Sequence, residues 1–221
     1  MGLKERSDLI REKLAKYLPN DFDKAVDILI KDLWPELSDV GDIQTDWNGF
    51  IILPQTSFVA KYGKDHFEKS MKDLYEMTKR LSSENDLRSC IEVDFVRSMQ
   101  ILHRWCEDGN HHIRRLVSEG TRPRLPLAGR IKTFQENPLP VIELLEKLKD
   151  DESLYVRRSV ANNINDISKD NPEIVIATLR KWNQIPNEKV KWVVRHASRS
   201  LVKQGNTEIL KMFGCDVDAL I

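Results

Sequence analysis

A short basic motif occurs three times in the second half of this 221-residue chain, and this repetition constrains the fold more than any other feature. The motif reads HIRRLV from His112, YVRRSV from Tyr155 and, more weakly, VVRHAS from Val193. The copies begin 43 and then 38 residues apart, and a helical apolar pattern lies between successive copies, at 141–148 and 173–182. A period of about 40 residues with two helices in each unit indicates stacked helical repeats.

We therefore predict an all-α fold, a right-handed solenoid of HEAT-like helical repeats with a concave basic groove. We expect a single domain over 1–221, with irregular helix pairs at 1–108, clear repeats at 109–205 and a short C-terminal cap at 206–221. A chain of this length can bury a sizeable core in one domain.

Helical apolar spacing also precedes the repeats. The expected helices cover 3–18, 22–33, about 64–81, a short stretch around Leu87 and Ile91, and 93–106. In the first of these helices, the expected core stripe consists of Leu9, Ile10, Leu14 and Tyr17 or Leu18. Between 34 and 63, prolines and glycines indicate a looser segment with short helical turns, and apolar residues that include Trp47 predict that it is packed. Trp105 and Trp182 lie on apolar faces and are predicted core residues.

The charges are distributed unevenly along the chain. The formal net charge is zero, but residues 1–110 hold 16 Lys+Arg against 21 Asp+Glu, whereas 111–221 hold 19 against 14. This asymmetry favours a polyanion-facing surface in the second half, although simple solvation of the charges explains it too. The three cysteines form no CxxC pair and no long apolar run occurs, so we predict a cytoplasmic protein without a zinc site, a disulfide framework or a membrane span.

The segment 114–126 places four arginines around the carboxylate of Glu119. Gly120 is expected to end the helix, so Glu119 lies in its last turn, where the helix dipole disfavours negative charge. One interpretation is an i, i+4 pair of Arg115 with Glu119, worth a few tenths of a kcal/mol. The other is a site for a substrate that is anionic along its backbone and cationic at its reacting centre.

The two later copies carry related polar lines. Arg158, Asn162 and Asp166 follow each other at intervals of four residues beside a core face, which gives Asp166 a position comparable to that of Glu119. In the third copy, cations recur every four residues on what we expect to be one helix, at Lys191, Arg195, Arg199 and Lys203. Four neighbouring cations repel one another, which favours a negative partner such as a phosphate backbone, although a solvated basic face fits equally well when taken alone.

Familiar catalytic motifs are absent from the sequence. There is no phosphate-binding loop, dinucleotide-binding motif, zinc-protease motif or serine-hydrolase motif. His111 and His112 are adjacent and therefore lack metal-ligand spacing, so we predict no metal and no cofactor.

Two segments resemble a known family. HHIRRLVSEGTRPRLP and YVRRSVANNINDISKD are similar to distinctive segments of the AlkC-type DNA alkylation repair proteins, which belong to the AlkC/AlkD superfamily of HEAT-like-repeat DNA glycosylases. The upstream segments YGKDHFEKSMKDLYEMTKRLSSENDLR and LAKYLPNDFDKAVDIL also resemble that family, so the resemblance covers nearly the whole chain.

The resemblance implies a monofunctional DNA glycosylase that hydrolyses the N-glycosidic bond of N-alkylated bases such as 3-methyladenine in duplex DNA. The family's acidic site residues correspond to Glu84, Glu119 and Asp166. Taken with the basic clusters, the predicted DNA-binding residues are Arg114, Arg115, Arg122, Arg124, Arg157, Arg158, Lys191, Arg195, Arg199 and Lys203. We further expect a monomer in the bacterial cytoplasm, associated with the nucleoid, that binds double-stranded DNA containing alkylated bases and has no membrane contact or obligate protein partner.

One position departs from the family pattern. The family string usually continues as LPW, whereas this chain has Leu125-Pro126-Leu127, and Leu127 cannot make the cation–π contact of a tryptophan. Two alternatives therefore stay open. One is a non-catalytic HEAT-like module that binds bent, damaged or branched DNA, and the other is a protein-interaction solenoid.

Overall fold

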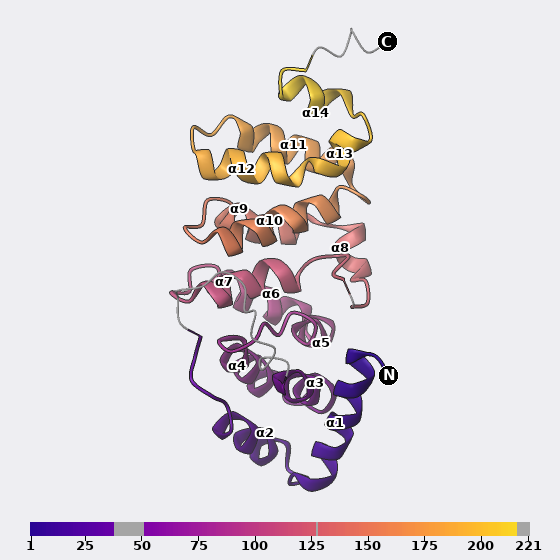
Figure 1. The fold of residues 1–221 in the computed structure, drawn as a ribbon, viewed down its shortest axis with the longest axis vertical. Helices are drawn as coiled ribbons and strands as arrows, with labels where there is room; N and C mark the ends of the chain where they lie inside the picture. The colour runs from indigo at the N-terminus through magenta and orange to yellow at the C-terminus, as the bar shows by residue number, and fades with distance from the viewer. Residues whose placement is uncertain (38–50, 127, 216–221) are drawn as a thin grey trace. The chain divides into compact units, whose positions relative to one another are not determined.

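The computed structural model describes residues 1–37, 51–126 and 128–215, and its regular elements within these ranges are helices, with no strand (Figure 1). The prediction of an all-α chain is confirmed. The chain divides into two compact units, Met1–Leu116 and Val117–Ile221. The prediction of a single domain over 1–221 stays a prediction, and each unit is described by itself.

Unit 1 contains six helices and the first part of a seventh, within its described residues. They are α1 (Leu3–Tyr17), α2 (Phe22–Lys31), α3 (Leu53–Tyr62), α4 (Phe67–Thr78), α5 (Leu87–Val93), α6 (Phe95–Trp105) and α7 (His111–Gly120). Helix α3 packs against α1, α2, α4 and α5, so it lies at the centre of this unit. Asp21 caps α2 by accepting a hydrogen bond from the Lys24 amide at 3.1 Å, as its sequence position predicts.

The predicted core stripe of α1 is wrong. No residue of α1 is buried, and Leu9 and Ile10 are each 49 % exposed. Polar contacts attach this helix to α3 instead: Arg11 donates to Ser57 at 2.8 Å, and Lys61 donates to Glu12 at 2.6 Å. The described packing partner of α1 is α3, and this contact leaves most apolar side chains of α1 outside a core.

The segment 34–63 also differs from the prediction of short turns. A ten-residue helix, α3, forms over Leu53–Tyr62, with Pro54 in its first turn and Phe58 and Val59 buried. Proline is compatible with helix there, because the amide it lacks would have no partner within the helix. Trp47 lies outside the described residues.

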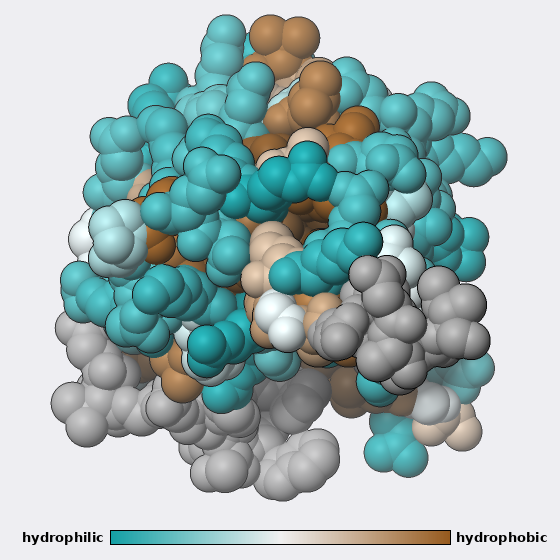
Figure 2. Space-filling view, turned by 90° about the horizontal axis from the view of Figure 1, so that it is seen from above, coloured by the Kyte–Doolittle hydropathy of each residue, from teal (hydrophilic) through white to brown (hydrophobic). Residues whose placement is uncertain are grey.

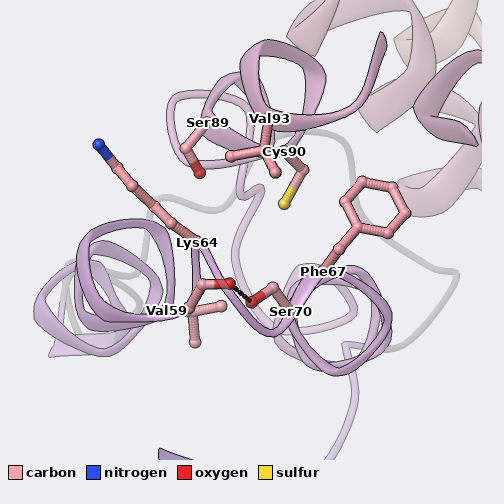
Figure 3. A pocket seen from close by; sticks show the side chains of 8 residues that line it. Val59, Lys64, Phe67, Ser70, Ser89, Cys90 and Val93 are labelled. Carbon is pink, nitrogen blue, oxygen red and sulfur yellow. Dashed lines mark hydrogen bonds between the residues drawn. The ribbon is translucent and has the colours of Figure 1, made fainter. Parts of the chain in front are cut away.

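Helices α3 and α4 approach closely at Gly63. The Ser70 hydroxyl donates to the Gly63 carbonyl at 2.9 Å, and a Cβ on Gly63 would lie 2.1 Å from that hydroxyl (Figure 3). The cavity beside this contact holds about 10 Å³, and Lys64 and Cys90 are among the residues that line it. That volume admits about one water molecule and excludes a nucleobase. Burial raises the pKa of the Cys90 thiol to about 11, so this group is not a nucleophile near neutral pH.

Unit 2 contains the remainder of α7 and seven further helices among its described residues. They are α8 (Lys132–Glu136), α9 (Leu139–Leu148), α10 (Leu154–Ile167), α11 (Pro172–Asn183), α12 (Glu188–Ala197), α13 (Arg199–Lys203) and α14 (Thr207–Met212). Helix α10 packs against α9, α11 and α12, which matches paired repeat helices. Trp182 is fully buried as predicted, whereas Trp105 of unit 1 is only half-buried and packs against Tyr75.

The predicted single helix over the basic line of the third copy is wrong. Helix α12 ends at Ala197, and α13 begins at Arg199. The Ser198 hydroxyl at this junction donates to the Val194 carbonyl at 2.8 Å, a bond that bends helices. Lys191 and Arg195 therefore lie on α12, separately from Arg199 and Lys203.

Two further observations concern the surface. On the face seen in Figure 2, most residues are hydrophilic, and hydrophobic residues form separate areas among them. Across the described ranges, we find no helix with the length and apolar character needed to span a bilayer.

Candidate functional site: two carboxylates on one buried arginine

In unit 2, Glu119 and Asp166 converge on a single guanidinium group. Arg122 Nη1 donates to Glu119 Oε1 at 2.6 Å, and Arg122 Nε donates to Asp166 Oδ2 at 2.7 Å. A third atom, Arg122 Nη2, also lies 2.7 Å from Asp166 Oδ2. All three residues are buried, with 5 % of Glu119, 8 % of Arg122 and 2 % of Asp166 exposed. Charges so far from water require partners of opposite sign, and this triad supplies them.

Helix ends position the two carboxylates. Glu119 lies in the last turn of α7 and Asp166 in the last turn of α10, where the helix dipole opposes a negative charge. Arg122 follows directly after α7 and compensates for this. Burial opposes the charge of the guanidinium, but Glu119 and Asp166 outweigh it and raise the pKa of Arg122 above its usual value. The arginine therefore stays charged and places one positive charge against both acids.

Each carboxylate has one oxygen left, and each of these accepts a further hydrogen bond. Ser159 donates to Glu119 Oε2 at 2.6 Å and is itself the acceptor for the Ser118 hydroxyl at 2.7 Å. Lys169 donates to Asp166 Oδ1 at 2.7 Å. The second oxygen of Glu119 is therefore bound by a buried hydroxyl group. The second oxygen of Asp166 is bound by a lysine whose side chain is 39 % exposed.

The third predicted acid, Glu84, lies in unit 1. Arg115 Nη1 donates to Glu84 Oε2 at 2.5 Å and to the Ser82 hydroxyl at 2.6 Å. The structure thus pairs Arg115 with Glu84 and pairs Glu119 with Arg122. As at Glu119 and Asp166, an acid of the predicted catalytic set is matched with an arginine of the predicted DNA-binding set.

Asp86 in the same segment is a candidate that sequence patterns did not single out. It is the N-cap residue of α5 but makes no side-chain capping bond. Burial raises its pKa to about 6, and the charge of Glu84 adds to this rise, while Thr56 and Arg11 oppose it. The position of Asp86 two residues after Glu84 was the only available signal, and it says nothing about burial.

In the first two copies of the basic motif, the first arginine binds the loop that precedes its helix. Arg114 Nη1 donates to the carbonyls of Asp108 and Gly109 at 2.8 and 3.0 Å. Arg157, 43 residues later, donates in the same way to Asp151 and Glu152 at 2.5 and 2.8 Å. Both side chains thus hold the loop that precedes their helix. This is a structural role, which the DNA-binding prediction does not include.

The same 43-residue register changes the comparison between the two carboxylates. It makes Asn162, rather than Asp166, the equivalent of Glu119. Asn162 accepts a hydrogen bond from Arg199 Nη2 at 3.0 Å, and Arg199 also donates to the His196 carbonyl at 2.8 Å. The likeness of Asp166 and Glu119 therefore comes from their shared arginine and not from equivalent places in the repeat.

The other predicted DNA-binding residues differ in whether an internal carboxylate already pairs with them. Arg124 is paired with Asp170, with Nε donating to Oδ2 at 2.8 Å, and this hydrogen bond holds the pKa of Asp170 below its usual value. Lys191 is paired with Glu188 at 2.8 Å. Arg195 and Lys203 are exposed, and Arg158 makes no hydrogen bond or ion pair with the part of the chain that the structure describes. Leu127, at the position of the family's tryptophan, lies outside the described residues.

Taken together, the fold and the site define a class of protein: an all-helical repeat protein in which carboxylates are held beside cationic side chains. No model of a protein family matches the chain. Individual proteins do match it. The chain is 36 % identical to the DNA-bound structure of Pseudomonas fluorescens alkylpurine DNA glycosylase AlkC, with a TM-score of 0.85, over 97 % of this chain and 56 % of that one.

Two further proteins are similar. YhaZ of Bacillus subtilis, an uncharacterized protein, is 38 % identical over 97 % of this chain and 57 % of its own length. AlkD2 from Streptococcus mutans is 22 % identical with a TM-score of 0.59, over 90 % of this chain and 89 % of that one, and it supports the fold alone. The chain spans little more than half the length of AlkC and YhaZ. The chain is thus similar to AlkC in sequence and fold over nearly its whole length, and it shares the helical fold of AlkD2.

Proposed function

We propose that this chain is a monofunctional DNA glycosylase that hydrolyses the N-glycosidic bond of N-alkylated bases, such as 3-methyladenine, in double-stranded DNA. One observation carries the proposal: Glu119 and Asp166, from two helices, both accept hydrogen bonds from the buried Arg122, whose pKa they raise. The similarity to AlkC, described as an alkylpurine DNA glycosylase bound to DNA, supports it.

The proposed chemistry needs no group beyond water and carboxylates. An N3-alkylated purine carries a positive charge, and its N-glycosidic bond breaks with the bonding electrons moving to the base, which leaves as a neutral molecule. The sugar becomes an oxocarbenium-like cation that negative groups stabilise. Water then attacks C1′ and loses a proton, which a carboxylate can accept. Glu119, Asp166 and Glu84 are the proposed carboxylates, and each of them accepts a hydrogen bond from an arginine.

The cations that reach solvent are the proposed phosphate contacts. Arg195, Lys203 and Arg158 have no described ion-pair partner, so a DNA backbone would not compete with an internal carboxylate for them. We further propose that the protein acts as a monomer in the cytoplasm, close to the nucleoid, because its proposed substrate is chromosomal DNA.

The test replaces the carboxylates by isosteric amides. Glu119→Gln and Asp166→Asn are expected to reduce release of 3-methyladenine from methylated duplex DNA by about 100-fold or more, with DNA binding retained. Each amide keeps an oxygen acceptor for Arg122 but removes the charge, and the melting temperature of each variant checks that the fold survives. Glu173→Gln, at an exposed carboxylate of α11, is the control. Release at the wild-type rate by both site variants would refute the assignment.

A second function is favoured by one specific observation. All four oxygens of Glu119 and Asp166 already accept hydrogen bonds from the protein, as expected of a structural ion cluster in a non-catalytic module for bent, damaged or branched DNA. Incubation with methylated duplex, followed by assays of both free base and retained DNA, separates the possibilities. Retention of DNA without base release supports the binding module. The absence of both retention and release would refute a DNA function and favour a protein-interaction solenoid.

A further inference from the structure

The two oxygens of Asp166 are held in different ways. Oδ2 receives two nitrogens of Arg122, each at 2.7 Å, and the arginine side chain is 10 % exposed and is also bound to Glu119. Oδ1 receives Lys169 Nζ at 2.7 Å, from a side chain that is 39 % exposed. The Asp166–Arg122 contact is therefore buried on both sides, whereas the lysine of the Asp166–Lys169 contact is exposed to solvent.

Lys169 is also the least anchored cation near Asp166. Arg199 interacts electrostatically with both Asp166 and Arg122, but hydrogen bonds to Asn162 and His196 hold its guanidinium group. Lys169 has no further hydrogen-bond or ion-pair partner within the described residues. A lysine ammonium on a four-carbon stem can also leave a contact more easily than a planar arginine fork.

We propose that Lys169 is a displaceable counter-ion of Asp166 and thereby a specificity-determining residue for cationic ligands. In the free protein, its ammonium group occupies Oδ1. A cationic base or a cationic sugar takes its place, and the ammonium moves into solvent. A neutral ligand gains little from Oδ1 and leaves the lysine in position. This inference rests on the proposed function for the nature of the ligand, and it adds the residue that distinguishes cationic from neutral lesions.

The competing role for an exposed lysine in a DNA-binding protein is a phosphate contact. The two roles predict opposite effects when the charge is removed. A phosphate contact would be lost for every duplex alike. A displaceable counter-ion would cease to compete, so only cationic ligands would bind more tightly.

The experiment measures binding and does not require turnover. Fluorescence anisotropy gives Kd for two duplexes of identical sequence, one with a pyrrolidine abasic-site analogue, which is protonated near neutral pH, and one with a neutral tetrahydrofuran analogue. Lys169→Gln is expected to tighten binding of the pyrrolidine duplex about three- to tenfold and to leave the tetrahydrofuran duplex within about twofold. Lys169→Arg keeps a cation that competes for Oδ1, so it should not tighten binding of the pyrrolidine duplex. Lys181→Gln, which removes a more exposed lysine paired with Glu146, is the matched control.

Each outcome decides the inference. Tighter binding of the pyrrolidine duplex relative to the tetrahydrofuran duplex in Lys169→Gln alone supports it, and a change of the ratio in the other direction overturns it. Loss of stability cannot imitate the expected result because it affects both duplexes equally. Equal weakening of both duplexes would identify a phosphate contact, and an unchanged ratio or no binding by the wild type would also overturn the inference. Base release from methylated DNA by the wild type is assayed in parallel. Its absence would refute the proposed function while the Kd ratio still reports on Lys169.

Discussion

At the scale of single residues, the fold gives two aspartates of this chain different surroundings. Asp166 is buried and accepts hydrogen bonds from Arg122 and Lys169. Asp86 has the opposite surroundings, since burial and the like charge of Glu84 together raise its pKa to about 6. The place of each aspartate in the fold therefore decides which charges surround it.

The raised pKa of Asp86 predicts a pH-dependent cost to stability. The folded pKa of about 6 lies above the reference value of 3.8, so stability is highest below pH 4 with respect to this group and falls as pH rises through 6. Asp86→Asn is expected to raise the free energy of unfolding by about 1–3 kcal/mol at pH 8 and to have little effect near pH 4. Urea denaturation at the two pH values measures this difference. An equal gain at both would show that the charge is not the cause.

At the scale of secondary-structure elements, the first arginine of the repeated motif fastens a loop to the helix that follows. Arg114 and Arg157 each bind two carbonyls of the preceding loop. At this position, the repeated arginine in the sequence therefore reflects a structural contact between a helix and the loop before it. The arginine that follows in the motif has a different environment in each copy: Arg115 pairs with Glu84, whereas Arg158 has no described partner.

Adjacent arginines on α10 allow a matched test of these two roles. Arg157→Met is expected to lower the free energy of unfolding by about 1–3 kcal/mol, because it leaves carbonyls without their donor, and to leave the salt dependence of DNA binding unchanged. Arg158→Met is expected to do the reverse, with little effect on stability and a salt slope smaller by about 1. Denaturant unfolding and Kd measured at several salt concentrations would check both. A reduced slope for Arg157→Met would assign that residue to the DNA interface.

Local signals explain which elements could be predicted from the sequence. The helix beginning at Phe22 and the paired repeat helices follow from caps and apolar spacing, both of which act within a few residues. Helix α3 was missed because its segment contains Pro54 among glycines and prolines, which are also frequent in loops. The break at Ser198 was missed because it depends on a side-chain bond to the backbone, which the four-residue charge spacing does not reveal.

The site was predicted only in part, for a related reason. The resemblance to the AlkC family supplied the three acids, and the arginines beside Glu119 were visible as a local cluster. The pairing of Arg122 with Asp166 joins residues 44 positions apart, so no spacing rule could give it. The same is true of Arg115 and Glu84, and the burial of Asp86 leaves no trace in the sequence.

At the scale of the whole molecule, a net charge of zero conceals an acidic first half and a basic second half. Binding to DNA would therefore depend on which cations are free to meet phosphates, and not on total charge. In the basic line of the third copy, Arg199 is held by Asn162, whereas Arg195 and Lys203 are exposed. The exposed pair is the better target for a test of the interface.

Reversing both exposed charges, as Arg195→Glu with Lys203→Glu, is expected to weaken binding to every duplex and to reduce the salt slope by about 2. The measurement is Kd against salt concentration for damaged and undamaged duplexes. Lys13→Glu with Lys16→Glu, at exposed positions on α1 in the acidic half, controls for the change in net charge. If both double variants alter the slope equally, the basic line has no special part in binding.

Helix α7 also limits how this chain can be dissected. The boundary between the two units falls between Leu116 and Val117, inside a continuous helix. A cut before α7 would separate Glu84 from Arg115, and a cut after α7 would separate Glu119 from Arg122. Neither fragment pair would preserve both ionic clusters. Fragments cut before or after α7 would therefore lose part of the candidate site, and a cut at the unit boundary would divide α7 itself, so activity has to be assayed on the uncut chain.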